Sequence, residues 1–288
     1  MLRILEVYFT AALLVTGAAA QAEITIDPAP VPGFAALAAE ADFTLEPFEA
    51  APETSVEQQL MNGTPVDPRV FPGVIRMTTG GTCTASIIGP ATILLASHCV
   101  PDMARINFKL GNSQIQGICQ HAPGYSVGIP FSNDLALCLL SNRVTGFAYE
   151  SVDIAHPTAS GDILALTGYG CTFEGGPLDG KLRIGVSKVV NKPFSNWPND
   201  PSTIYTRSDL TQGEAVVCPG DSGGPLFRTG QDVGGPRKIV GINSRTTYSV
   251  GVSLFAAVAS PAGIAFLQNW AATNQVEICG VNRQTGCK

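Results

Sequence analysis

Short runs of Val, Ile, Leu and Thr alternate with Gly, Pro and Asn turns from about Val70 onward. Residues 85–88, 92–96 and 135–140 are clear examples, each bounded by turn-forming residues. Runs of this length and composition are typical of β-strands. The chain is therefore expected to be all-β through most of its length.

A helical pattern stands out near the end of the chain. Ser260 can cap a helix and Pro261 can occupy its first turn, and Ile264, Phe266 and Trp270 follow. Apolar residues preceded by a cap and a proline predict a short helix after the strands. With 288 residues, 45% of them hydrophobic, the chain can bury a substantial core.

The first 59 residues differ in composition from the rest. Residues 1–20 carry Arg3, a short apolar stretch and small residues up to Ala20, the pattern of a signal peptide cut near Ala20 or Ala22. Residues 21–59 are rich in Ala and Pro and hold eight acidic residues but no Lys or Arg. This composition indicates an acidic pro-segment or flexible leader, with a plain linker as the alternative.

The apolar part of residues 1–20 is short and is interrupted by Glu6 and Thr10. No later run reaches the roughly 18 apolar residues that suggest a membrane span. We therefore expect a secreted protein without a stable membrane anchor.

Charge and cysteine content narrow the class of protein. The net charge of −6 comes from the leader, because the chain from Leu60 onward has 14 acidic and 16 basic residues and no basic run. No nucleic-acid partner is expected. The even number of cysteines, without C-x-x-C or C-x-x-C-H spacing, favours disulfides over a metal or haem site, and no cofactor is expected. The eight cysteines are Cys83, Cys99, Cys119, Cys138, Cys171, Cys218, Cys279 and Cys287.

Residues 218–226, with the sequence CPGDSGGPL, have the character of a nucleophile turn around Ser222. Small neighbours let a substrate backbone approach, and the amides of Gly220 and Ser222 can point together at a developing oxyanion. The alternative is an ordinary Gly-rich turn.

A serine nucleophile needs a base, and the chain has three histidines. His98 is the outstanding candidate, because it follows a predicted strand and precedes Cys99, which can pin its loop. A buried structural histidine is the alternative. His121 and His156 lie in loops without an adjacent acid or nucleophile pattern.

Asp134 is the candidate acid that orients the imidazole. It directly precedes an apolar run starting at Leu135, so its carboxylate is drawn toward the core and needs a partner. An aspartate in a surface turn is the alternative.

In this chain order, the segments around His98, Asp134 and Ser222 resemble the three signature motifs of the chymotrypsin and trypsin family of serine proteases. The resemblance runs from about Leu60 to Trp270 and includes residues 83–88 and 167–170. It implies two packed six-stranded antiparallel β-barrels with a short C-terminal helix. The peptidase domain is then 60–288, with the first barrel at about 60–150 and the second barrel, helix and tail at about 151–288.

The resemblance implies a serine-type endopeptidase, a hydrolase that works through an acyl-enzyme. His98 would deprotonate Ser222, and the amides of Gly220 and Ser222 would hold the oxyanion. A catalytically silent protease-like binding protein or inhibitor is the main alternative. An esterase of another fold would place its residues in the order Ser, acid, His. The expected partners are protein or peptide substrates, an activating protease and protein inhibitors, and a monomer is expected.

The segment starting at Leu60 resembles the family's mature amino terminus, whose freed amine inserts beside the acid that precedes the nucleophile, here Asp221. Cleavage after Gln59 would then activate a zymogen, because a buried unpaired carboxylate is costly and a cation relieves it. Before cleavage the oxyanion hole is expected to be poorly formed. Gln59 is not the Lys or Arg that a trypsin-like activator cuts. Asn62, Gly63 and Thr64 match the acceptor sequence for N-glycosylation, but we interpret them mainly as a turn.

The resemblance supports a Cys83–Cys99 disulfide, which closes a loop of about 15 residues worth about 3 kcal/mol in the chain-entropy model. Cys119 with Cys138, on neighbouring strands of the first barrel, and Cys171 with Cys218, beside the oxyanion region, are plausible pairs outside the family's usual set. Cys279 with Cys287 remains.

The family's specificity pocket implies a substrate-binding role for four residues. Val216 occupies the pocket floor, and an uncharged floor does not pair with a substrate Lys or Arg. Ser244, Arg245 and Thr246 form the wall strand, where Arg245 replaces the usual aromatic residue and Thr246 the usual glycine. An apolar or small residue before the scissile bond is favoured, with an acidic residue through Arg245 as the weaker alternative.

Overall fold

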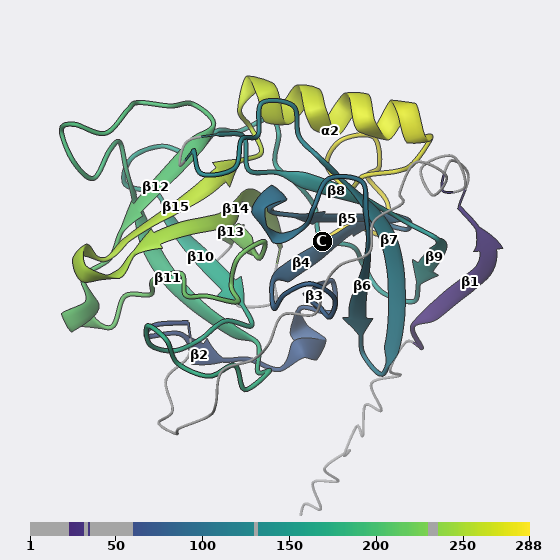
Figure 1. Cartoon of the computed structure of the whole chain (residues 1–288), viewed down its shortest axis with the longest axis horizontal. Coiled ribbons are helices and arrows are strands. Elements are labelled where there is room, and N and C mark those ends of the chain that lie inside the picture. Colours follow the sequence, from purple (N-terminus) through teal and green to yellow (C-terminus); the bar gives the residue numbers. More distant parts are fainter. Residues whose placement is uncertain (1–22, 32–33, 35–59, 130–131, 230–235) are drawn as a thin grey trace, which may run out of the picture.

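The computed structural model describes residues 23–31, 34, 60–129, 132–229 and 236–288. The expected signal peptide and most of the acidic leader, including Gln59, lie outside the described residues. The described part is built mainly of antiparallel strands, with one long helix near the C-terminus (Figure 1). The all-β prediction is confirmed.

Six antiparallel strands of the first half close into a barrel in the order β3-β4-β5-β8-β7-β6. Side chains on both faces of these strands are buried, since Ile93 and Leu94, consecutive residues of β5 that point to opposite faces, and Leu137 of β8 are all fully buried. The apolar runs seen in the sequence are therefore the strands of this barrel. The strands are β3 (Val74–Met77), β4 (Thr84–Gly89), β5 (Thr92–Leu95), β6 (Ala104–Leu110), β7 (Ser113–His121) and β8 (Ala136–Leu140).

The second half forms a sheet in the order β10-β13-β14-β15-β12-β11-β2, and an additional β10–β11 pairing joins the ends of its six long strands into a ring. The two rings lie side by side in Figure 1. Two six-stranded antiparallel barrels are thus present, as the resemblance implied. The strands are β10 (Ile163–Gly168), β11 (Arg183–Val190), β12 (Thr203–Arg207), β13 (Pro225–Thr229), β14 (Arg237–Thr247) and β15 (Val252–Ala257).

The boundary between the barrels differs from the expected one at the N-terminal side. The short strand β2 (Thr64–Pro65) pairs with β11 and so belongs to the second barrel. The first barrel begins at β3, not near residue 60. The reason is that Met61, just before β2, forms an antiparallel bridge to Val216 of the second half.

A strand also occurs inside the acidic leader, where a flexible segment was one expectation. β1 (Thr25–Pro30) pairs antiparallel with β9 (Asn142–Thr145) at the edge of the molecule that is remote from the second barrel (Figure 1). Its prolines break helices, but they are tolerated in a strand at a sheet edge, where one side needs no N–H donor.

The C-terminal helix α2 (Pro261–Asn274) begins as the sequence predicted. The Ser260 hydroxyl accepts a hydrogen bond from the Gly263 N–H at 3.0 Å, and Pro261 lies in the first turn. Phe266 and Trp270 are among the side chains that pack into the core. Short 3-10 turns η1 (Pro68–Val70), η2 (Ser97–Cys99), η3 (Leu210–Gln212) and η4 (Tyr248–Val250) connect the strands.

A buried ion pair connects the segment between the barrels to the second barrel. Glu150 and Arg237 are both almost fully buried, and the carboxylate accepts hydrogen bonds from Arg237 Nε and Nη2 at 2.8 and 2.6 Å. The Arg237 guanidinium also lies over the rings of Phe71 and Phe227. This pair helps to fix β14, which carries residues of the candidate site.

Candidate active site

His98 and Asp134 meet at one end of the first barrel. His98 lies in η2 directly after β5, and Asp134 lies just before β8, the strand that pairs with β5. His98 Nδ1 is 2.7 Å from Asp134 Oδ2, and the His98 backbone N–H donates to Asp134 Oδ1 at 2.9 Å. Two contacts from one residue fix both the carboxylate and the imidazole orientation.

A third contact to Asp134 comes from the second barrel. The Ser244 hydroxyl donates to Asp134 Oδ2 at 2.6 Å. The β14–β15 register shifts between Asn243 and Arg245, so Ser244 lies in a bulge. Bulges next to active sites re-aim a side chain, and here the bulge turns the Ser244 hydroxyl toward the first barrel.

These contacts set the charge state of Asp134. The carboxylate is almost completely buried. Burial alone raises the pKa, but the hydrogen bonds and charge of His98, with the Ser244 hydroxyl, outweigh it and hold the pKa of Asp134 below its usual value. Asp134 is therefore ionised at neutral pH, as a group that orients an imidazole and stabilises the imidazolium must be.

Ser222 lies in the tight turn that precedes β13, in the second barrel. Its carbonyl oxygen accepts a hydrogen bond from the Thr84 N–H of β4 at 2.8 Å, which ties the turn to the first barrel. Gly223 has φ +79, and a Cβ there would clash with the Thr84 carbonyl and lie 3.2 Å from the Ala96 N. This close approach brings the Ser222 turn beside the loop that carries His98.

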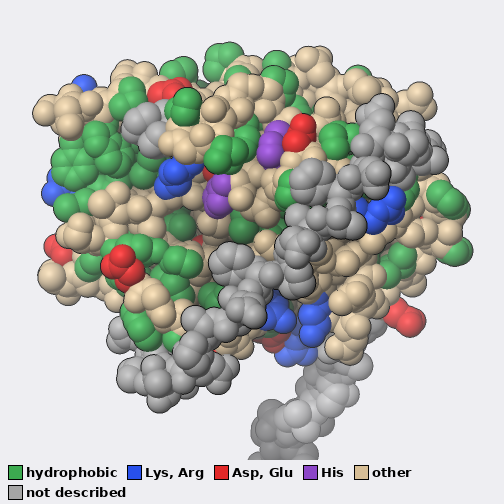
Figure 2. Space-filling model, viewed as in Figure 1, with side chains coloured by type: hydrophobic (Ala, Val, Ile, Leu, Met, Phe, Trp, Pro, Cys, Tyr) green, Lys and Arg blue, Asp and Glu red, His purple; other side chains and the backbone are tan. Residues whose placement is uncertain are grey.

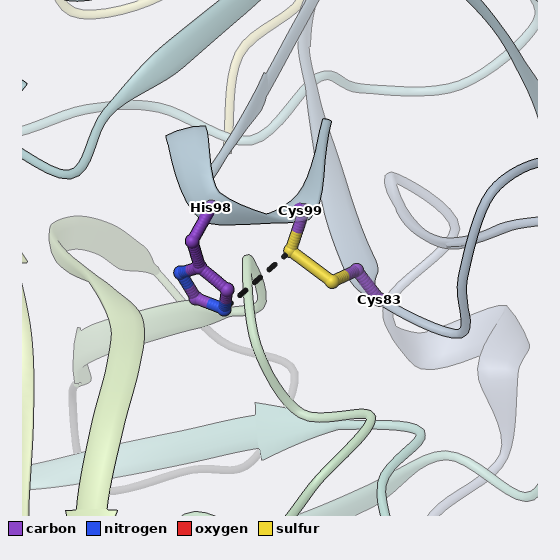
Figure 3. Close-up of side chains that lie close together, drawn as sticks. All are labelled: Cys83, His98 and Cys99. Carbon is purple, nitrogen blue, oxygen red and sulfur yellow. Dashed lines mark hydrogen bonds between the residues drawn. A yellow bond between two sulfur atoms is a disulfide. The ribbon is translucent and has the colours of Figure 1, made fainter. Parts of the chain in front are cut away.

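The His98 side chain is partly exposed, and its Nε2 is the nitrogen that does not face Asp134. Figure 3 shows this nitrogen next to the Cys83–Cys99 disulfide, with Nε2 at 3.9 Å from Cys99 Sγ. Within the described chain, no hydrogen bond joins Nε2 to the Ser222 hydroxyl. In structures without substrate such catalytic hydrogen bonds are often long and tighten only when substrate binds. Histidine side chains reach the surface in the middle of the face shown in Figure 2, among mostly uncharged side chains.

The two other histidines are engaged elsewhere. His121 Nε2 lies 2.7 Å from the Val100 carbonyl oxygen, and its ring packs edge-on against Tyr125. His156 Nδ1 lies 2.9 Å from Asp153 Oδ1. Of the three, His98 is the one that the structure pairs with Asp134.

The backbone around Gly220 is held from two sides. The Pro219 carbonyl accepts a hydrogen bond from the Cys171 N–H at 2.7 Å, and the Gly220 carbonyl accepts one from the Thr84 hydroxyl at 2.8 Å. Gly220 has φ +95, a conformation that glycine adopts without strain. No acceptor in the described residues takes the N–H of Gly220 or Ser222.

Two free N–H groups two residues apart in a tight turn can donate to a developing oxyanion. The carbonyls on this stretch are held by Cys171 and Thr84, which fixes part of the backbone around the two N–H groups. The expectation of a poorly formed hole before cleavage stays a prediction.

Asp221 is fully buried between these two residues. Its oxygens accept hydrogen bonds from the Gly170 N–H at 2.8 Å and the Cys218 N–H at 2.9 Å. Burial raises its pKa to about 7, against the opposing effect of these donors and the more distant Arg183. No cation of the described chain forms an ion pair with Asp221.

The segment that starts at Leu60 is inserted in the second barrel. Leu60 is fully buried in the apolar cluster that includes Leu166 and Val217, and it has φ +36, which is unusual for a side chain of this size. The Val216 N–H donates to the Met61 carbonyl at 3.1 Å. The Asn62 side-chain amide donates to two carbonyls, those of Leu210 and Glu214, both at 3.1 Å.

The structure places the four residues expected to bind substrate in different settings. Val216 is fully buried, and the Ser244 hydroxyl is used to hold Asp134. The Thr246 hydroxyl donates to the Val252 carbonyl at 3.1 Å. Arg245 is half-buried, and its Nε has no hydrogen-bond partner within the described residues. A cavity of about 340 Å³ is lined by Arg245, Thr246 and Trp197 among others.

All eight cysteines are paired in the structure. The pairs match the expected ones, and two of them act near the site: Cys83–Cys99 joins β4 to the His98 turn, and Cys171–Cys218 joins the segment after β10 to the start of the nucleophile turn. The four disulfides are Cys83–Cys99, Cys119–Cys138, Cys171–Cys218 and Cys279–Cys287.

The grouping of Cys83, His98 and Cys99 has the compactness of a metal site (Figure 3). Its sulfur atoms are joined in a disulfide, however. A disulfide offers no thiolate, which is the form of cysteine that binds metals. The donor set therefore does not fit a metal ion.

The trypsin family model matches residues 60–264, which is more than half of the chain. The chain belongs to the trypsin family. Trypsin-family relatives include serine endopeptidases, and four disulfides and the all-β fold agree with membership. No α-helix in the part of the chain that the structure describes has the length and apolar character needed to cross a membrane.

Proteins similar to this chain occur in organisms that are distantly related to one another. Granzyme M of Homo sapiens is 28% identical over 196 residues, which cover 60% of this chain and 75% of that protein. Serine protease SP24D of Anopheles gambiae is 27% identical over 193 residues, 61% of this chain and 70% of the relative. Chymotrypsin-like elastase family member 3B of Macaca mulatta is 27% identical over 203 residues, 61% and 78% of the two chains.

Thr84 belongs to the site although its sequence context did not predict a role for it. It is fully buried, its hydroxyl donates to the Gly220 carbonyl, and the Tyr169 N–H donates to the same hydroxyl at 3.0 Å. Its position next to Cys83, in the segment that carried the family resemblance, was the available signal. That signal did not reveal a contact across the two barrels.

Proposed function

We propose that the chain is a secreted serine endopeptidase in which Ser222 is the nucleophile, His98 the general base and Asp134 the acid that orients it. The observation that carries this proposal is the His98–Asp134 pair, with its 2.7 Å contact, next to a Ser222 turn that has two unoccupied N–H groups. His98 takes the Ser222 proton as the hydroxyl attacks a peptide carbonyl. The Gly220 and Ser222 N–H groups stabilise the oxyanion, and water then hydrolyses the acyl-enzyme.

We further propose that the protein is made as a zymogen, with a signal peptide at 1–20 and an acidic pro-segment at 21–59. Cleavage before Leu60 supplies an ammonium group to Asp221. This role is supported by the complete burial of Asp221, its raised pKa and the insertion of residues 60–62 into the second barrel. An ammonium partner favours the carboxylate form and removes the cost of a buried unpaired charge.

For specificity we propose an apolar or small residue before the scissile bond. Support comes from Val216, which offers no charge to a substrate Lys or Arg. Arg245 adds a preference for an acidic substrate residue, since its guanidinium has no ion-pair partner among the described residues and an unpaired cation attracts a carboxylate.

Peptide hydrolysis by the cut protein tests the function. Internally quenched peptides with Ala, Val, Leu, Asp or Lys before the scissile bond are incubated with the secreted chain after cleavage at residue 60. Turnover of the apolar peptides, abolished in Ser222→Ala, supports the proposal. Absence of turnover from correctly cut and folded protein contradicts it and favours a catalytically silent, protease-like binding protein.

A charge variant tests the specificity proposal separately. Arg245→Gln keeps a long polar side chain and removes the cation. It should lower turnover of the acidic peptide relative to the alanine peptide, while the alanine peptide is cut as before. An unchanged ratio of the two rates contradicts a role of Arg245 in selecting acidic residues.

A further inference from the structure

The leader strand β1 is bound to the first half of the protein by backbone pairing. Thr25 faces Thr145, Ile26 faces Val144 and Pro30 faces Asn142. The pairing continues beyond the strand, where the Val31 N–H donates to the Ser141 carbonyl at 2.9 Å. Figure 1 shows β1 along the outer side of β9.

Apolar side chains anchor the same segment. Val31 is only 3% exposed and belongs to the main apolar core, while Ile26 and Phe34 are half-buried and pack against that core. The Arg105 guanidinium lies over the Phe34 ring, 5.4 Å from its centroid. The segment is therefore held by core contacts as well as by its strand pairing.

The surface that receives the strand is shaped for it. Gly146, at the end of β9, has φ +96, and a Cβ there would clash with the Glu23 carbonyl. The edge of β9 would otherwise present unpaired N–H and C=O groups, which are a template for adding another strand. β1 and β9 form a two-stranded sheet of their own, so β1 is the partner of that edge.

Nothing covalent holds this segment once the chain is cut before Leu60. All eight cysteines lie at residue 83 or later, and each is paired with another of them. The pro-segment is therefore joined covalently to the peptidase domain through the peptide chain alone. Among the described residues, the contacts that can keep the segment bound are the β1–β9 pairing and the anchors Ile26, Val31 and Phe34.

We propose that the edge of β9 is a binding site for the chain's own pro-segment, so that β1, Val31 and Phe34 remain attached to the cut protein as part of a non-covalent light chain. The inference rests on the proposed cleavage before Leu60, but not on catalysis. The ligand class is an extended, proline-containing acidic peptide, which is recognised by strand addition with side-chain anchors. The bound segment keeps Val31 in the core and covers the edge of β9.

The test uses the secreted full chain carrying Ser222→Ala, which prevents self-digestion, and a site-specific protease sequence inserted before Leu60. After cutting at micromolar concentration, gel filtration and native mass spectrometry follow the pro-fragment. Co-elution of the pro-fragment with the 60–288 chain supports the proposal. Loss of the fragment from the native protein as soon as the chain is cut overturns it.

Competition on the same cut complex identifies the anchor without requiring a variant protein to fold. Excess synthetic peptide 23–34 should displace the pro-fragment. The Val31→Asp peptide should need a concentration about ten times higher, or more, to displace the same amount of pro-fragment. The reason is that burial of a valine side chain raises binding affinity by at least this factor. The Pro28→Asp peptide adds the same charge at an exposed residue and should compete like the unmodified peptide. Equal competition by the Val31→Asp and Pro28→Asp peptides overturns the proposed site.

These readouts are independent of activity. A cut chain that retains its pro-fragment but hydrolyses no peptide with Ser222 restored contradicts the proposed function and leaves the binding site standing. A cut chain that hydrolyses peptides after losing its pro-fragment contradicts the binding site and leaves the proposed function standing.

Discussion

The Thr84 hydroxyl in the first barrel donates a 2.8 Å hydrogen bond to the Gly220 carbonyl in the second. Thr84 lies at the start of β4, next to Cys83, whose disulfide partner Cys99 follows His98. One short segment thus contacts both the loop that carries the proposed base and the turn that carries the proposed oxyanion donors. This arrangement makes Thr84 a positioning residue.

Replacement of Thr84 by valine tests this role. Thr84→Val keeps the side-chain shape but removes the hydroxyl, so the Gly220 carbonyl and the Tyr169 N–H lose their partner. We expect kcat of the cut protein to fall about tenfold with KM unchanged, a smaller loss than the roughly 100- to 1000-fold for a direct oxyanion donor. Thr78→Val, which removes an exposed hydroxyl, is the control. Equal kcat values for the two variants would contradict the positioning role.

The Cys171–Cys218 disulfide should contribute more to stability than the C-terminal disulfide. It spans a sequence separation of 47, whereas Cys279–Cys287 spans 8. In the chain-entropy model the two bridges are worth about 4 and about 2.5 kcal/mol.

Urea unfolding of the two double-alanine variants measures this difference. The variant without Cys171–Cys218 should be the less stable and should also lose activity, because Cys171 and Cys218 flank the oxyanion turn. If the variant without Cys171–Cys218 were as active as the variant without Cys279–Cys287, the expected loss of activity would be contradicted.

Asp221 predicts a pH dependence that differs between the uncut and cut chains. In the uncut chain its pKa is raised from 3.8 to about 7 by burial, so the folded state binds a proton more tightly than the unfolded state. This contribution to stability is complete below about pH 4 and is lost as the pH rises toward and through 7. The uncut chain should therefore lose stability from Asp221 as the pH rises from about 4 to about 7.

The matched measurement is urea unfolding of both forms across this pH range. In the cut chain an ammonium partner lowers the Asp221 pKa, so the loss of stability should be much smaller. The difference between the two forms isolates Asp221 from groups that both share. Parallel pH profiles would contradict pairing of the new amino terminus with Asp221.

Local patterns identified the strands and the His98, Asp134 and Ser222 candidates, because each lies in a short, distinctive segment. The N-terminal part of the leader was not predicted as a strand, since the pairing of residues 25–30 depends on β9, more than 100 positions away. The bulge at Ser244 and the hydroxyl of Thr84 were also missed. Their roles arise from contacts between barrels, which have no local signature in the sequence.

The most direct test of the central proposal is labelling of the cut, secreted protein with a fluorophosphonate probe, followed by mass spectrometric mapping of the modified residue. The proposed mechanism predicts a single adduct on Ser222 that is lost in Ser222→Ala and in His98→Ala. Failure of the correctly cut, folded protein to react, or an adduct on another residue, would contradict it.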